Sequence, residues 1–187
     1  MAPNLPSPSS LTSLPQEQQF QVLDTLFESS PELHTLMAPV LANQAFSSYN
    51  SLIDAVGGRM SALSAANSPT DKAILVGILG SHPRLGQPKV AQTEHLSELS
   101  KKEQAQLNTG AEEQAERLRL LNNEYEEKFP GLRFVTFVNG RSRDVIMEEM
   151  RQRIGRGNSE LEIEEIIRAM CDIAKDRARK LEQSARI

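Results

Sequence analysis

Apolar residues recur along this chain at the spacing of three and four positions that places them on one face of an α-helix. The first such stretch follows Pro15, where Phe20, Leu23, Leu26 and Phe27 share a face. The same spacing predicts further helices over 32–42, 46–64, 69–80, from 100, 111–129, 142–154 and from 159 onward. The pattern therefore predicts an all-α fold, a compact single-domain bundle of about seven to nine helices.

Capping residues mark several of the expected helix boundaries. Ser68 is positioned to cap the helix that Pro69 opens, because proline is favoured at the first helical position. Ser142 is expected to cap the helix that follows it. Ser159 and Glu162 have the spacing of a capping box, which predicts that Ser159 caps the last helix.

One short stretch breaks the helical pattern. Residues 134–138 are rich in β-branched and aromatic side chains but too isolated to form a sheet, so an extended buried segment crossing the helices is expected. The backbone N–H and C=O groups of such a segment need partners. A polar ligand would satisfy them, and neighbouring helices or water would do so equally well.

Composition narrows the class of protein. The chain has 187 residues, of which 39% are apolar and 4% aromatic, so the core must consist of Leu, Ile, Ala, Val and Met. A net charge of −4 argues against nucleic-acid binding. No apolar run approaches the roughly 20 residues that span a bilayer, and no secretory signal is seen. The single cysteine, Cys171, excludes an internal disulfide and indicates a reducing compartment.

The N-terminal residues differ from the rest of the chain. Residues 1–12 are rich in Pro and Ser and lack periodicity. They are expected to form a disordered arm, ahead of a single helical domain over residues 13–187.

His82 is the first candidate for chemistry. It directly precedes Pro83, which disfavours the helical region for His82 and holds its backbone extended where a helix ends. Such a histidine is suited to proton transfer near neutral pH, although a loop histidine that merely caps a helix end explains the position as well. His34 and His95 have no comparable context and no ligand spacing, so no metal site is expected.

Ser100, Glu103 and Gln104 form a second candidate group. They read either as a capping box or as side chains that project together to hydrogen-bond a heterocycle. Arg177 is a third candidate, because it continues the apolar stripe of the last helix where a core residue is expected. Three interpretations fit: a structural ion pair, a packed side-chain stem whose head group reaches solvent, or a clamp for an anionic ligand.

These motifs together resemble the family of 2-oxo-4-hydroxy-4-carboxy-5-ureidoimidazoline (OHCU) decarboxylases. His82-Pro83-Arg84-Leu85-Gly86 matches the family's His-Pro-x-Leu-Gly, and Ser100–Gln104 matches its Ser-x-x-Glu-Gln. Asn122, Tyr125, Lys128 and Phe129 match an Asn-x-x-Tyr-x-x-Lys-Phe element, followed by an extended segment at 134–139 and an arginine, Arg177, in the last helix. The order and the approximate spacings agree over residues 16–183.

The resemblance implies a cofactor-free carboxy-lyase of urate (purine) catabolism, which forms (S)-allantoin and acts as a homodimer on a small-molecule substrate. It implies that His82 is the catalytic acid/base. The substrate-binding residues that it implies are Pro83, Ser100, Glu103, Gln104, Val135, Thr136, Phe137, Val138, Asn139 and Arg177.

Two departures from the family pattern leave alternatives open. Arg84 stands where the family often has an acidic residue, which would change the charge of the pocket, and residues 130–134 suggest a one-residue insertion. A catalytically impaired helical interaction module of the same fold, or a lyase for a related ureido heterocycle, are the alternatives.

The last residues suggest a cellular address. Ala185, Arg186 and Ile187 resemble a variant of the peroxisomal Ser-Lys-Leu signal, which predicts recognition by the peroxisomal import receptor. Without that signal a cytoplasmic location is expected.

Overall fold

The computed structural model describes residues 4–86, 98–107 and 112–185, with the side chains of 104–107 excepted. The described chain is all-α, as predicted, and no described residue lies in a β-strand. Its elements are the 3₁₀-helix η1 (Pro8–Ser13) and the α-helices α1 (Gln16–Leu26), α2 (Pro31–Asn43), α3 (Tyr49–Ala66), α4 (Pro69–Leu79), α5 (Glu98–Leu107), α6 (Glu112–Lys128), α7 (Arg143–Arg156) and α8 (Ser159–Ser184).

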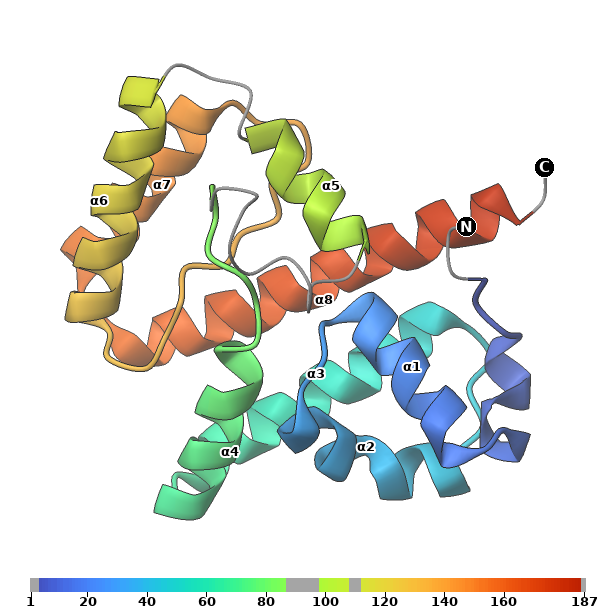
Figure 1. Ribbon diagram of the computed structural model, residues 1–187. Coiled ribbons are helices and arrows are strands. Elements are labelled where there is room, and N and C mark those ends of the chain that lie inside the picture. Colours follow the sequence, from blue (N-terminus) through green and yellow to red (C-terminus); the bar gives the residue numbers. More distant parts are fainter. Residues whose placement is uncertain (1–3, 87–97, 108–111, 186–187) are drawn as a thin grey trace.

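The long helix α8 organises the fold. It crosses the molecule between the group of α1 to α4 and the group of α5 to α7 (Figure 1). Its apolar stripe packs on α3 and α1, while α6 packs on α7. Buried aliphatic and aromatic side chains from both groups join one hydrophobic core. No described helix is long and apolar enough to cross a membrane.

Most predicted helix starts agree with the structure because they depend on local capping. The Ser68 hydroxyl accepts a hydrogen bond from the backbone N–H of Asp71 at 3.1 Å, and Ser142 caps α7 in the same way. The prediction that Ser159 caps α8 is wrong. Asn158 is the cap and accepts from two backbone N–H groups, which leaves Glu162 free for a different role.

The N-terminal residues also differ from the prediction. The interpretation of residues 1–12 as a disordered arm is wrong for the part that the structure describes, since Pro8–Ser13 form η1 and Leu11 is fully buried. The carbonyl oxygen of Leu11 accepts a hydrogen bond from Gln19 at 2.7 Å, and the Tyr49 hydroxyl donates to the carbonyl of Pro6 at 2.7 Å. One apolar residue, Leu11, thus fixes this Pro- and Ser-rich segment to the core.

The stretch between α6 and α7 is the expected extended segment. Residues 134–138 belong to no helix, and Phe134, Val135 and Thr136 are buried. A tight turn ends the segment, in which the N–H of Arg141 donates to the carbonyl of Val138 at 2.9 Å. Asn139 and Gly140 have positive φ values of 44° and 74°, the conformation that an Asn-Gly pair adopts at least cost.

Candidate active site

A cavity of about 300 Å³ lies where the His82 corner, α5, the extended segment and α8 meet. Its volume is at the lower end of the range for small-molecule sites. The predicted site residues that line it are His82, Pro83, Ser100, Glu103, Val135, Thr136, Phe137, Val138 and Asn139. The structure thus brings together residues from three separate parts of the sequence. The side chain of Gln104, like all of His95, lies outside the described residues.

His82 is buried in the wall of this cavity, with 6% of its surface exposed. Burial, the largest cause, and the nearby positive charge of Arg177 together lower the pKa of the imidazole to about 3, against a hydrogen bond from the ring to the backbone carbonyl of Phe27 that favours the charged form. The ring is therefore neutral at neutral pH, so it does not act as a cationic cap of α4. Its Nδ1 atom has no hydrogen-bond partner within the described part of the chain.

Arg177 is held entirely by protein groups. Its Nε and Nη2 atoms donate to the two carboxylate oxygens of Glu103 at 3.0 and 2.7 Å, a two-pronged pairing that suits the guanidinium fork. Nη2 also donates to the Ser100 hydroxyl at 2.7 Å, and Nη1 donates to the carbonyl of Leu26 at 3.1 Å. Burial disfavours the charge, yet these carboxylate contacts raise the pKa of Arg177 overall.

These contacts bear on the interpretations of Arg177 and of Ser100. The ion pairs of Arg177 with Glu28 and Glu103 agree with the structural interpretation, and Arg177 is not among the described residues that line the cavity; its role as an anion clamp stays a prediction. The guanidinium fixes the Glu103 carboxylate at the cavity wall. Ser100 lies inside α5, which begins at Glu98, so the capping-box interpretation of Ser100 is wrong.

Glu28 is a member of this cluster that the sequence did not reveal. Its carboxylate lies 3.2 Å from Nη2 of Arg177 and accepts a hydrogen bond from the Ser100 hydroxyl. The residue is 2% exposed and has a φ of 126°, a strained conformation for a non-glycine residue. The available signal was a charged residue directly after the apolar face of the first helix, which is too common to identify a site.

Arg84 points away from the cavity. Its Nε and Nη2 atoms donate to the Glu126 carboxylate on α6 at 2.7 and 3.1 Å, and Nη2 donates to Asn123 at 2.6 Å. It is absent from the described lining, so the expected change in the charge of the pocket is wrong. Arg84 instead anchors the His82 corner to α6, as does the hydrogen bond from Asn122 to the carbonyl of Leu85 at 3.1 Å.

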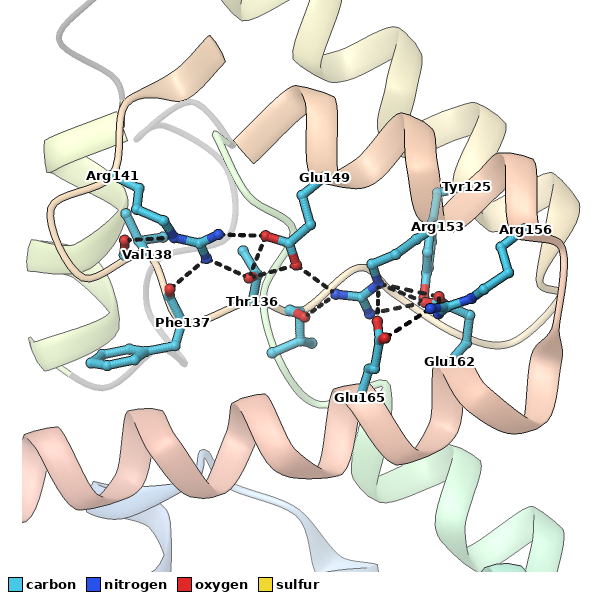
Figure 2. Close-up of polar contacts among 11 residues, drawn as sticks. Tyr125, Thr136, Phe137, Val138, Arg141, Glu149, Arg153, Arg156, Glu162 and Glu165 are labelled. Carbon is cyan, nitrogen blue, oxygen red and sulfur yellow. Dashed lines mark hydrogen bonds and ion pairs between the residues drawn. The ribbon is translucent and has the colours of Figure 1, made fainter. Parts of the chain in front are cut away.

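The far wall of the cavity is the extended segment, which a network of charged residues supports from behind. Arg141 and Arg153 bind its carbonyl oxygens, and Glu149 lies between the two arginines (Figure 2). Glu162, which is fully buried, accepts hydrogen bonds from Arg153 and from the Tyr125 hydroxyl. No sequence pattern indicates this network, because its members approach one another only in the folded chain.

Charged residues of α8 form a further part of the lining that the sequence did not single out. Arg179 and Lys180 pair with Asp176 at 2.7 and 2.6 Å, and all three line the cavity. Among the described residues, no three His, Cys, Asp or Glu side chains come together in an arrangement able to hold a metal ion. The arrangement as a whole offers a neutral imidazole, a fixed carboxylate and an exposed stretch of backbone.

A helical fold with a buried imidazole and a fixed carboxylate in one cavity defines a class of site suited to proton transfer on a small polar molecule. The sequence model of the OHCU decarboxylase family matches residues 12–179. The chain therefore belongs to this family.

Comparison with solved structures agrees on the fold. A crystal structure of (S)-allantoin synthase superimposes with a TM-score of 0.60 at 18% sequence identity, over 94% of this chain and 54% of that chain. The present chain thus spans about half the length of that protein. No curated protein matches the sequence significantly.

Proposed function

We propose that this chain catalyses the decarboxylation of OHCU to (S)-allantoin in urate catabolism. The observation that carries the proposal is the neutral His82 ring, which lines the same cavity as Glu103 and whose Nδ1 has no hydrogen-bond partner among the described residues. Membership of the OHCU decarboxylase family and the fold shared with (S)-allantoin synthase support it.

The ring of the substrate itself accepts the electrons of the breaking bond, so the protein has to orient the substrate and deliver a proton to it. The bond between the ring and its carboxylate breaks, carbon dioxide leaves, and the electron pair passes into the adjacent C=N bond of the ring. The ring nitrogen takes up one proton from solvent. His82 accepts the proton of the 4-hydroxyl group as a neutral base and returns it to one face of C5, which sets the configuration of the product.

The other groups of the cavity hold the substrate. The Glu103 carboxylate, fixed by Arg177, accepts hydrogen bonds from ring N–H groups. The backbone of residues 135–139 binds the ureido arm, whose alternating N–H and C=O groups match those of an extended chain. Holding both ends of the substrate keeps C5 within reach of His82.

Turnover of substrate generated freshly from oxidised urate, followed by circular dichroism, tests the proposal. Excess (S)-allantoin over the protein-free reaction is expected. A rate and an enantiomer ratio equal to those of the protein-free reaction would refute it, and turnover of a related ureido heterocycle instead would support the alternative lyase. Arg84 pairs with Glu126 and is not among the described residues that line the cavity, which supports an active enzyme over the impaired interaction module.

We also propose a homodimer, and import into peroxisomes through Ala185, Arg186 and Ile187. The family resemblance supports the first, and the resemblance of these residues to a peroxisomal signal supports the second where they end the mature protein. Residues 186–187 lie outside the described residues. Light scattering on the purified protein tests the dimer, and the location of a fluorescent fusion with and without the three residues tests import.

A further inference from the structure

The extended segment separates two hollows of the molecule. On one side it lines the cavity that contains His82, and on the other side Thr136, Phe137 and Asn139 line a second hollow next to Arg141 and Arg153. Residues 134–138 belong to no helix or described strand, so ordinary secondary structure does not fix this wall. Some other interaction must hold its backbone in place.

Two arginines supply that interaction. Arg153 donates from Nη1 to the carbonyl of Val135 at 3.0 Å. Arg141 donates from Nη2 to the carbonyl of Phe137 at 2.6 Å and from Nε to the carbonyl of Val138 at 3.3 Å. Arg141 also donates to the Thr136 hydroxyl at 2.7 Å. The carbonyls of Val135 and Phe137 are therefore bound from the side of α7, and the Val138 carbonyl is bound where the chain turns back (Figure 2).

The direction of these contacts determines which backbone N–H and C=O groups of the segment remain available to bind a ligand. In an extended chain the polar groups of residues two apart point to the same side, and those of the residue between them point to the opposite side. Since the carbonyls of Val135 and Phe137 are bound by the arginines, we expect the N–H and C=O of Thr136 to face the opposite side, where Thr136 lines the His82 cavity. No backbone N–H of 135–138 donates a hydrogen bond to another described residue.

The arginines are themselves fixed by carboxylates. Glu149 pairs with Arg141 at 2.6 Å and with Arg153 at 3.2 Å. Arg153, whose side chain is 5% exposed, also pairs with the fully buried Glu162 at 2.9 Å. Since each guanidinium has a carboxylate partner on a helix, its remaining N–H groups are directed at the segment with little freedom.

We propose that Arg141 and Arg153 are positioning residues for substrate binding: they bind one side of the 135–137 backbone and thereby present its other side to the ureido arm. This inference rests on the proposed function for its substrate. Arg141 holds the end of the segment next to the Asn139-Gly140 turn, and Arg153 holds the end next to Phe134.

The test compares Arg141→Met, Arg141→Lys and the control Arg151→Met. Arg151 lies on α7, is half exposed and pairs only loosely with Glu148 at 3.4 Å, so its loss removes an arginine without touching the segment. Two measurements are made on each folded protein. Backbone ¹⁵N order parameters of residues 135–139 report the rigidity of the segment without any need for activity, and steady-state kinetics report KM and kcat.

In Arg141→Met the order parameters of the segment are expected to fall from about 0.85 to below about 0.6, with wild-type values in the control. KM is expected to rise about tenfold with kcat within about twofold of wild type, because the segment binds a part of the substrate remote from the breaking bond. Arg141→Lys keeps the charge beside Glu149 but lacks the planar fork, so it is expected to behave like Arg141→Met.

Unchanged order parameters in Arg141→Met would overturn the inference whatever the activity. Full recovery by Arg141→Lys would also overturn it, because charge pairing with Glu149 would then be the whole role of Arg141. A mobile segment with an unchanged KM would refute its role in binding substrate. A wild-type protein that does not decarboxylate OHCU would refute the proposed function instead, and the order parameters would still decide whether Arg141 holds the segment.

Discussion

The low pKa of His82 makes the stability of this protein depend on pH in a way that one substitution isolates. The folded value of about 3 lies below the ordinary value of 6.5. Between these two values the unfolded chain binds a proton that the folded chain does not. The free energy of unfolding therefore rises with pH across this window. The contribution of the neutral His82 ring is complete above pH 6.5 and is lost as the solution is acidified toward pH 3.

The size of the effect follows from the shift. Each pH unit within the window corresponds to about 1.4 kcal/mol, so acidification from about pH 7.5 to about pH 4.5 removes roughly 2–3 kcal/mol through His82. Because the ring is only 6% exposed, solvent screening reduces this little. His82→Gln removes the titrating group while keeping a polar side chain. Other groups titrate in both proteins and cancel in the difference between them.

Urea unfolding at the two pH values measures this difference. The midpoint of the wild-type protein is expected to fall by about 1 M more than that of His82→Gln, for a slope of about 2 kcal/mol per molar urea. The same change of midpoint in both proteins would refute the assignment of a buried, neutral imidazole. An NMR titration of the His82 ring gives an independent value of its pKa.

Two further substitutions test the ion pairs that shape the site. Arg177→Met leaves the Glu28 and Glu103 carboxylates together without their cation. It is expected to lower the free energy of unfolding, measured in urea, by about 3 kcal/mol. A loss below about 1 kcal/mol would show that the cluster is not essential for stability. Arg84→Ala removes a partly buried pair with Glu126, and Arg84 is not among the described residues that line the cavity. A loss of about 1 kcal/mol and a KM within about twofold of wild type are expected; a large change in KM would place Arg84 in the pocket after all.

The sequence predicted the features of this fold that depend on neighbouring residues. Helix starts at Ser68 and Ser142 follow from a side chain and the N–H group three residues beyond it. The apolar stripe of the last helix also indicated correctly that Arg177 faces the core, where it is 1% exposed. Capping and apolar spacing can be recognised in the sequence because the residues that define them lie within about one or two helical turns of each other.

Several residues were misinterpreted or missed because their partners are distant in the sequence. Glu162 was assigned to a capping box, yet it pairs with Arg153 because Asn158 already caps the helix. The direction of Arg84 depends on Glu126, which lies on α6. The role of Glu28 depends on its ion pair with Arg177, which lies near the other end of the chain. One charged residue in a sequence does not indicate which of many opposite charges it will meet.

The central claim is that the buried imidazole of His82 moves the proton that sets the configuration of the product. Its most direct test is the enantiomer excess of allantoin formed from freshly generated OHCU by the wild-type protein and by folded His82→Gln. The account predicts (S)-allantoin from the wild type and a rate at least about 100-fold lower, without enantiomer excess, from the variant. Equal rates and equal enantiomer excess in the two proteins would contradict it.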